Sequence, residues 1–301
     1  MKPQKEIKNL ILLFSIALCW GPSYYFIMIA LESFPPLTIV AFRVLLGAIV
    51  LFLVVLSRGR RLLDYKHAFP HFLIMALTAC VIPFTLVTLS ETMISSSLAA
   101  IVNASVPIFV AFMAHFLIDQ ERMSLMKWIG IFCGLLGIGL VYAPSLIGDM
   151  DTKSTGILLV IIASLSYGLG MIYGKVFLYD IPGLVAPTWQ LIFSSLIILP
   201  FSLIIDKPWQ LGMPSWLSLF GLISLSLIGT ALAFYLYYTL LNSAGATYLS
   251  LVSFLFPIVG INLGVILLKE KITWSSFAGC GLILLGLLIT TYKTSKQKEL
   301  S

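Results

Sequence analysis

Charged residues are scarce in this chain. Asp, Glu, Lys and Arg make up 10% of its 301 residues, whereas hydrophobic residues make up 60%. Soluble globular proteins carry about 25% charged residues, and the mean hydropathy of +1.07 points the same way. The connections between apolar segments reach roughly a dozen residues at most, far short of a domain. The composition therefore excludes a soluble protein and indicates one embedded in a membrane.

Cysteine is also rare. The four cysteines all lie within apolar segments, at spacings that match no zinc motif. We interpret them as small apolar residues and predict neither a disulfide nor a metal site. They are Cys19, Cys80, Cys133 and Cys280.

Carboxylates are missing from the middle of every apolar segment. All twelve Asp and Glu residues lie in connections, at the termini or near segment ends. General acid–base catalysis needs positioned carboxyl groups or similar side chains, and the chain also lacks a Walker-type phosphate loop. We therefore predict no catalytic residue, no cofactor and no direct use of ATP. Proton coupling has no obvious carrier, although Glu32 and Glu91 lie near segment ends, and facilitated diffusion remains open.

Ten apolar segments are long enough to cross a bilayer, which takes about 20 mostly apolar residues. Proline, glycine and charged residues separate them. The first segment continues for about 20 residues without a cleavage site, so it is a helix and not a signal peptide. The segments are 10–30, 37–57, 69–89, 97–118, 125–143, 156–177, 184–205, 216–240, 247–268 and 274–292.

The basic residues predict the orientation of these segments. With a cytoplasmic N-terminus, thirteen of the 18 Lys and Arg residues lie inside, four lie outside and Arg43 lies within a segment. This excess of inside positive charge predicts a multi-pass protein of the cell membrane (inner or plasma membrane) with both termini cytoplasmic. It also explains the net charge of +6 without a nucleic-acid partner, and none is predicted.

The chain also repeats itself at offsets of 147 to 150 residues. A block of five segments followed by its copy must cross the membrane the second time in the opposite direction. The sequence therefore predicts an all-α integral membrane protein of ten transmembrane helices, arranged as two inverted five-helix repeats. The repeats are residues 1–145 and 153–293, and residues 294–301 form a short cytoplasmic tail. Matched pairs are Trp20 with Tyr167, Arg43 with Gln190, Pro107 with Pro257, and Glu121 with Glu270.

These residues also carry a family resemblance. The Cys19-Trp20-Gly21-Pro22-Ser23 start, the Pro35-Pro36 turn, Phe42-Arg43 and the repeated pattern of proline, glutamate and glycine-rich helix resemble the EamA-like branch of the drug/metabolite transporter superfamily. The resemblance covers essentially the whole chain. It implies a central cavity between the two repeats, and export of amino acids, other metabolites or toxic compounds. It does not identify the substrate.

Arg43 is the only full charge deep within a segment. Polar groups in a bilayer are costly, so they face a cavity or a partner. Arg43 either extends outward or caps free backbone carbonyls, or it anchors an anionic group of the substrate or locks a gate. Its repeat mate, Gln190, is neutral, which makes the predicted site electrically asymmetric.

Other candidates are small, polar or aromatic residues within the segments. Pro107 and Pro257 remove a backbone hydrogen bond and are predicted hinges or cavity residues, with simple packing as the alternative. An aromatic cavity suits amphipathic cargo or, through cation–π attraction, a cationic group. The predicted substrate-binding residues are Trp20, Arg43, Asn103, Tyr167, Trp189, Gln190 and Tyr235.

We expect a secondary transporter that moves small molecules across the cytoplasmic membrane by alternating access. The alternative is an integral-membrane enzyme or a scaffold without transport activity. The predicted partners are a small-molecule substrate and the lipid bilayer. A stripe of small residues serves close packing, either within the monomer or in a homodimer; it consists of Gly130, Gly134 and Gly137, echoed by Gly279 and Gly286.

Overall fold

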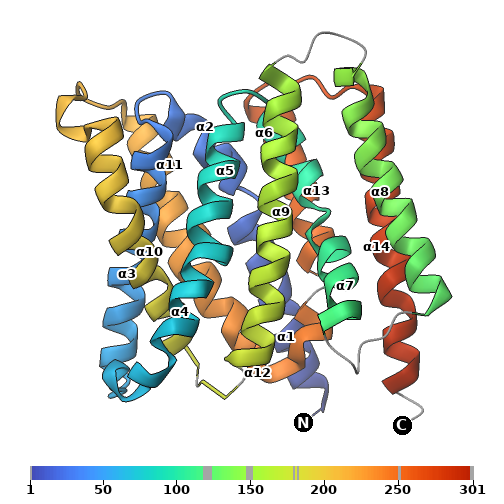
Figure 1. The fold of residues 1–301 in the computed structure, drawn as a ribbon, viewed down its shortest axis with the longest axis horizontal. Coiled ribbons are helices and arrows are strands. Elements are labelled where there is room, and N and C mark those ends of the chain that lie inside the picture. The colour runs from blue at the N-terminus through green and yellow to red at the C-terminus, as the bar shows by residue number, and fades with distance from the viewer. Residues whose placement is uncertain are drawn as a thin grey trace.

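The computed structural model is a bundle of helices that lie side by side (Figure 1). It describes residues 2–117, 124–146, 152–178, 180–181, 183–249 and 252–298, and no strand occurs among them. Side chains in these ranges are described except those of residues 2–5, 144–146, 241–242, 244–249, 253–254, 256–257, 287 and 290–298.

The described part of the first half of the chain forms five long or broken helices. Their elements are α1 (Lys2–Trp20), α2 (Ser23–Leu31), α3 (Pro36–Ser57), the 3₁₀ helix η1 (Leu62–Ala68), α4 (Phe69–Ala76), the π-helical η2 (Leu77–Val81), α5 (Ile82–Ser90), α6 (Ser96–Asn103), α7 (Val106–Leu117) and α8 (Leu125–Leu146).

The second half continues in the same manner. Its elements are α9 (Thr152–Phe177), α10 (Val185–Phe201), the π-helical η4 (Ser202–Asp206), the 3₁₀ helix η5 (Pro208–Gln210), α11 (Trp216–Ser226), the π-helical η6 (Leu227–Leu232), α12 (Ala233–Leu249), α13 (Val252–Leu267) and α14 (Trp274–Lys298).

Eight stretches of the described residues are long and apolar enough to cross a membrane, and two shorter apolar helices follow them, at Ile258–Leu267 and Trp274–Gly286. The fold is therefore that of a multi-pass membrane protein. The predicted segment 216–240 agrees with the span Trp216–Leu240. The helix itself continues as α12 to Leu249, because the Asn-Ser-Ala-Gly stretch that suggests a loop stays helical. The eight spans are Glu6–Leu31, Pro36–Ser57, Leu62–Ser90, Ser96–Leu117, Leu125–Ala143, Thr152–Phe177, Val185–Asp206 and Trp216–Leu240.

Two of the spans are interrupted near a proline. α1 ends at Trp20, and Pro22, which has no N–H to continue the hydrogen bonds of that helix, is the N-cap of α2. A Cβ atom on Gly21 would lie 2.5 Å from Cβ of Val259, so α1 and α13 cross closely at this break. α6 ends at Asn103, four residues before Pro107. In a continuous helix the Pro107 ring would clash with the carbonyl group of Asn103.

Three π-helical segments lie within otherwise α-helical spans. A π-helical turn leaves the regular hydrogen-bond pattern of the helix and occurs frequently at functional sites. Two of them, η2 and η6, begin 150 positions apart, at Leu77 and Leu227. Cys80 in η2 and Thr230 in η6 are also 150 positions apart. The same irregularity therefore occurs at equivalent positions of the two sequence repeats.

The glycine stripes bring α8 and α14 together within the monomer, at one end of the molecule (Figure 1). A Cβ atom on Gly286 would lie 2.4 Å from the backbone oxygen of Gly130, and one on Gly137 would lie 2.7 Å from that of Gly279. Such contacts require glycine, since a backbone atom cannot move aside. Close packing inside one chain is thus a use of this stripe.

α1 begins and α14 ends at the same end of the bundle (Figure 1). The η1 segment lies at this end too, whereas the turn between α13 and α14 and the start of α6 lie at the opposite end (Figure 1).

Candidate functional site

Arg43 of α3 lies inside the bundle, with 5% of its surface exposed. Its Nε atom donates a hydrogen bond of 2.8 Å to Oγ1 of Thr230, and Nη2 makes a weaker contact of 3.5 Å with the carbonyl oxygen of Gly229. The guanidinium carbon lies 3.7 Å from the centre of the Phe84 ring, which is a cation–π contact. The charge is therefore held by neutral oxygens and a ring.

The π-helical turn in η6 explains why an arginine can be held there. Thr230 donates its hydroxyl hydrogen to the carbonyl oxygen of Leu225, 3.0 Å away, and accepts from Arg43 with the same oxygen. Arg43 uses two of its five N–H donors in these contacts and forms no ion pair among the described residues. Donors therefore remain for an anionic group.

Gln190 makes the corresponding contact on the other half of the chain. It is 2% exposed on α10, and its Nε2 atom donates to Sγ of Cys80 in η2 at 3.0 Å. Arg43 and Gln190 are 147 positions apart, and their partners Thr230 and Cys80 are 150 apart. Each helix therefore contacts the π-helical turn of the opposite half, once with a charged and once with a neutral side chain.

Asn103 joins three helices near this position. Its amide donates to the Tyr24 hydroxyl at 2.7 Å, and Oδ1 accepts from Oγ of Ser164 at 3.0 Å. Tyr167, one turn further along α9, packs on the Phe84 ring with 6.2 Å between ring centres. We call the whole group the central cluster; it consists of Tyr24, Arg43, Cys80, Phe84, Asn103, Tyr167, Gln190 and Thr230.

Three predicted site residues lie in other groups. Trp189 donates from Nε1 to the carbonyl oxygen of Leu62 at 3.1 Å and packs on Phe69, 4.4 Å between ring centres. The Tyr235 hydroxyl accepts from Nη2 of Arg58 at 2.8 Å. Trp20 packs on Tyr237 between α1 and α12, with 5.6 Å between ring centres. The structure thus groups Arg43, Asn103, Tyr167 and Gln190 and places Trp20 and Trp189 elsewhere. Tyr235 also packs against the hydrophobic cluster that contains Cys80 and Phe84.

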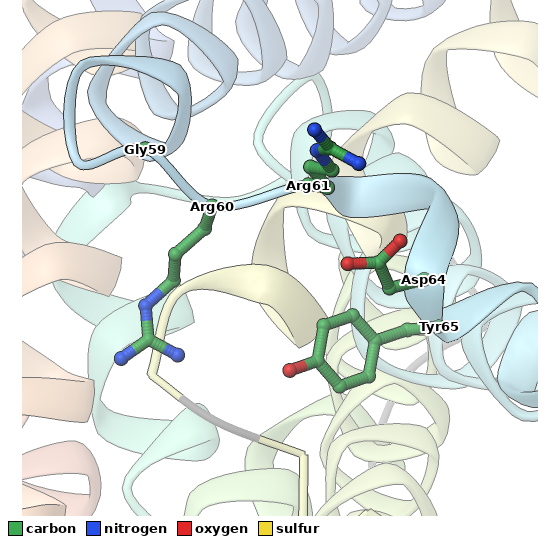
Figure 2. A pocket seen from close by; sticks show the side chains of 5 residues that line it. All are labelled: Gly59, Arg60, Arg61, Asp64 and Tyr65. Atoms are coloured by element: carbon green, nitrogen blue, oxygen red, sulfur yellow. The ribbon is translucent and has the colours of Figure 1, made fainter.

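A basic hollow of about 400 Å³ lies beside η1, at the end of the bundle where α14 also ends. Gly59, Arg60, Arg61, Asp64 and Tyr65 line it. Figure 2 shows the Arg60 and Tyr65 side chains extending to the same side of the chain, while Arg61 points the other way. Gly59 has a φ of +68°, which lets the chain turn sharply between α3 and the hollow.

At the opposite end, carboxylates from the second half cap helices of the first. Glu270, in the turn between α13 and α14, accepts from N and Oγ of Ser96 at 2.8 Å each and from N of Ser97 at 2.9 Å. Free N–H groups at a helix start are ready acceptor-binding sites. Asp206 does the same for α3, since it accepts from N and Oγ1 of Thr38 at 2.7 and 2.9 Å. We call the first contact the Glu270 cap.

Glu91 lies next to α5 at this same end, just outside the membrane span. It is 3% exposed, and neither carboxyl oxygen has a hydrogen-bond partner among the described residues. Burial raises the pKa of Glu91 well above its ordinary value, the Glu270 charge raises it further, and Arg43 lowers it.

Sequence reasoning treated Glu91 and Glu270 as residues of connections. The three consecutive serines at the start of α6 were the available signal for a capped helix start. Tyr24, Phe84 and Thr230 carried no such signal, because an isolated aromatic or threonine in an apolar segment is ordinary.

The two predicted hinges lie in broken or interrupted helices. Pro107 occupies the first turn of α7, half-buried, directly after the break at Ala104 and Ser105. Pro257 lies within α13, and its side chain is outside the described residues, as are Glu121 and Arg122.

Comparison with known proteins supports transport. The chain is similar to the uncharacterized transporter YoaV of Bacillus subtilis (strain 168), with 25% identity over 97% of this chain and 99% of that protein. It is also similar to the uncharacterized inner membrane transporter YedA of Escherichia coli (strain K12), with 26% identity over 93% and 89%. A solved crystal structure whose description names no function shares the fold, with a TM-score of 0.71 over 96% of this chain and 98% of the other at 16% identity.

The family model of the EamA-like transporter family matches twice, at residues 7–143 and again at 154–292. Together the two matches cover nearly the whole chain. This protein is therefore a member of the EamA-like transporter family.

Proposed function

We propose that this protein is a secondary transporter of small molecules in the cytoplasmic membrane, with amino acids, other metabolites or toxic compounds as its cargo. Its ten helices form two inverted five-helix halves, residues 1–145 and 153–293, which rock around a central site. The twofold family match supports two homologous halves. No coupling to ATP is proposed, and Pro107 and Pro257 are the proposed hinges.

The orientation follows the basic residues. Both termini and the basic hollow face the cytoplasm, and the Glu270 cap faces outward. The common end of α1, η1 and α14 supports this arrangement (Figure 1). We therefore call the cap end the outer end.

One observation carries the proposal of a central site: Arg43 and Gln190 contact Thr230 and Cys80 reciprocally between the two halves. A site at the junction of two moving halves can bind cargo alternately from each side. Arg43 is the anchor for a carboxylate or another anionic group, because guanidinium donors remain free and carboxylates bind such a fork in a two-point geometry. Phe84 and Tyr167 offer aromatic surface beside it.

Transport into proteoliposomes tests this assignment, after a growth screen of expressing cells against amino acids and toxic analogues has identified a carboxylate cargo. Uptake of the carboxylate and of its amide is compared at equal amounts of folded protein. Arg43→Lys keeps the charge but loses the fork and should be impaired. Arg43→Gln, which copies its repeat mate, should reduce carboxylate uptake at least about tenfold, in keeping with loss of a charge-assisted hydrogen bond, and leave the amide nearly unaffected.

Lys207→Gln is the matched control, because it removes an exposed positive charge away from both the central cluster and the basic hollow. It should leave both uptakes unchanged. Equal losses for carboxylate and amide in Arg43→Gln would refute the anchor and leave Arg43 as a structural residue of the η6 contact.

A further inference from the structure

Glu91 is a buried carboxyl group that belongs neither to the central cluster nor to a helix cap. It follows the last turn of α5, its main-chain N–H bonds the carbonyl oxygen of Val87, and its side chain is 3% exposed. Both carboxyl oxygens lack hydrogen-bond partners among the described residues. An ionised carboxylate in such a place is strongly unfavourable, whereas a protonated one costs far less.

The groups that face Glu91 strengthen this conclusion. Glu270, from the turn between α13 and α14, is near enough for the two charges to interact, and Arg43 of α3 and the Tyr24 hydroxyl of α2 also lie within electrostatic range. Lys153 at the start of α9 and Lys271 beside Glu270 line a neighbouring hollow of about 240 Å³ around Ser97. Glu270 receives three hydrogen bonds in its cap and Glu91 receives none, so a single proton shared between them belongs on Glu91.

We propose that Glu91 is the proton-binding site of the transport cycle and that its protonation holds the outer end closed through the Glu270 cap. This proposal rests on the proposed transport function. With the proton on Glu91, Glu270 is the only carboxylate of the pair and can cap α6 without repulsion. When the proton passes to water at the outer surface, the Glu91 carboxylate repels Glu270 and requires hydration. Both effects break the cap and separate the second half from α6.

The direction of the pH effect follows from this linkage. The closed state binds the proton more tightly than an open state in which Glu91 is hydrated, so acid favours closure. As the pH rises through the pKa of Glu91 in the closed state, closure is lost. Each closing event at the outer end therefore takes up one proton from that side.

Labelling of a cysteine at Ser97 measures the opening without any cargo. The Ser97 side chain is 1% exposed, and its hydroxyl has no hydrogen-bond partner among the described residues, so Ser97→Cys preserves the backbone contact of the cap. The full-length variant in intact cells is treated with a membrane-impermeant maleimide at several external pH values. The protein that retains Ser97 gives the labelling of the native cysteines, which is subtracted. The rate of Ser97→Cys combined with Glu91→Gln at each pH corrects for ionisation of the new thiol.

The corrected labelling rate should rise with pH by up to about tenfold per unit below the pKa, as expected where opening follows the loss of one proton. Glu91→Gln is permanently neutral and should label slowly at every pH. Glu270→Gln weakens the cap and should label fast already in acid. Glu32→Gln, the same change at an exposed carboxylate of the outer end, should keep the pH profile of the unchanged protein.

The proposal is overturned if the uncorrected labelling rate rises with pH as steeply in Ser97→Cys with Glu91→Gln as in Ser97→Cys alone. If Glu91→Gln fails to insert, Glu91→Asp serves instead and must shift the midpoint of the pH profile; an unshifted midpoint also overturns it. Infrared spectra of the purified protein provide a second readout. The band of the protonated carboxyl group must diminish in Glu91→Gln, and in Glu91→Asp it must diminish or titrate at a different pH. The labelling result stands whether or not a cargo is found, so its failure is distinct from failure of the transport function.

Discussion

At the scale of single residues, polar side chains inside the bundle are paired across helices that lie far apart in the sequence. Asn103 binds Tyr24, 79 positions earlier, and Ser164, 61 positions later. Arg43 and Thr230 are 187 positions apart. Within a membrane such hydrogen bonds contribute modestly, on average about 0.6 kcal/mol each, but a buried polar group left without its partner costs more. These pairs therefore fix which helices can be neighbours.

Asn103→Ala should lower the stability measurably, because it leaves the Tyr24 hydroxyl and Ser164 without their shared partner. We expect a loss of about 1–3 kcal/mol, measured by reversible denaturation in mixed micelles. Asn262→Ala is the control, since that amide is exposed and bonds only the Ile258 carbonyl of its own helix. Equal changes in the two variants would contradict a structural role for the Asn103 contacts.

Residue spacing alone could identify Arg43 and Gln190 as a pair but could not identify what they touch. The offset of 147 positions places both in the same element of their repeats. Their partners, Thr230 and Cys80, are an ordinary threonine and cysteine in apolar segments. The contact depends on three-dimensional crossing of the halves and on two π-helical turns, neither of which hydrophobic periodicity reveals. The buried state of Glu91 was likewise hidden, because a carboxylate at a helix end is usually solvated.

At the scale of elements, hydrophobic length predicted most of the spans, while the interruptions decide how they pack. The break at Gly21 and Pro22 allows α1 to cross α13 closely. Between α8 and α14, the glycines similarly let the two backbones pack directly against each other without intervening side chains. Proline and glycine marked these places in the sequence, but the π-helical turns carry neither a proline nor a common pattern, so they could not be foreseen.

Gly286→Ala should weaken the α8–α14 pair. Its new methyl group would meet the Gly130 carbonyl oxygen and the Gly134 backbone, which cannot move aside. Overpacking of this kind costs about 1–3 kcal/mol, and the thermal unfolding midpoint in detergent should fall. Gly281→Ala lies on the same helix with nothing within 4 Å of the added atom, and it should be neutral or slightly stabilising because alanine favours helix. A stable Gly286→Ala variant would refute the tight contact.

At the scale of the whole molecule, the family model matches the two halves of one bundle. The sequence repeat behind this double match was predicted from the nearly constant offsets at which similar residues recur. Two carboxylates of the second half, Asp206 and Glu270, cap α3 and α6 of the first half. Glu121, the repeat mate of Glu270, lies outside the described residues.

The orientation can be tested with single cysteines in intact cells. Thr92→Cys, exposed at the outer end, should react with an impermeant maleimide added outside, whereas Lys298→Cys should react only after the membrane is permeabilised. The physical reason is the excess of basic residues on the inner side. Reaction of position 298 from outside would contradict both the orientation and the ten-helix arrangement.

The basic hollow beside η1 would act on solutes before they bind. Arg60 and Arg61 outnumber Asp64 among its lining residues, so the hollow, which is the inner entrance in the proposed orientation, carries a positive potential. Such a potential steers anions by diffusion and repels cations, over a screening length of about 8 Å at physiological ionic strength. Anionic cargo would therefore enter from the cytoplasm at a rate that falls with added salt, while its maximal turnover stays constant, and the entrance would select charge before the central cluster recognises shape.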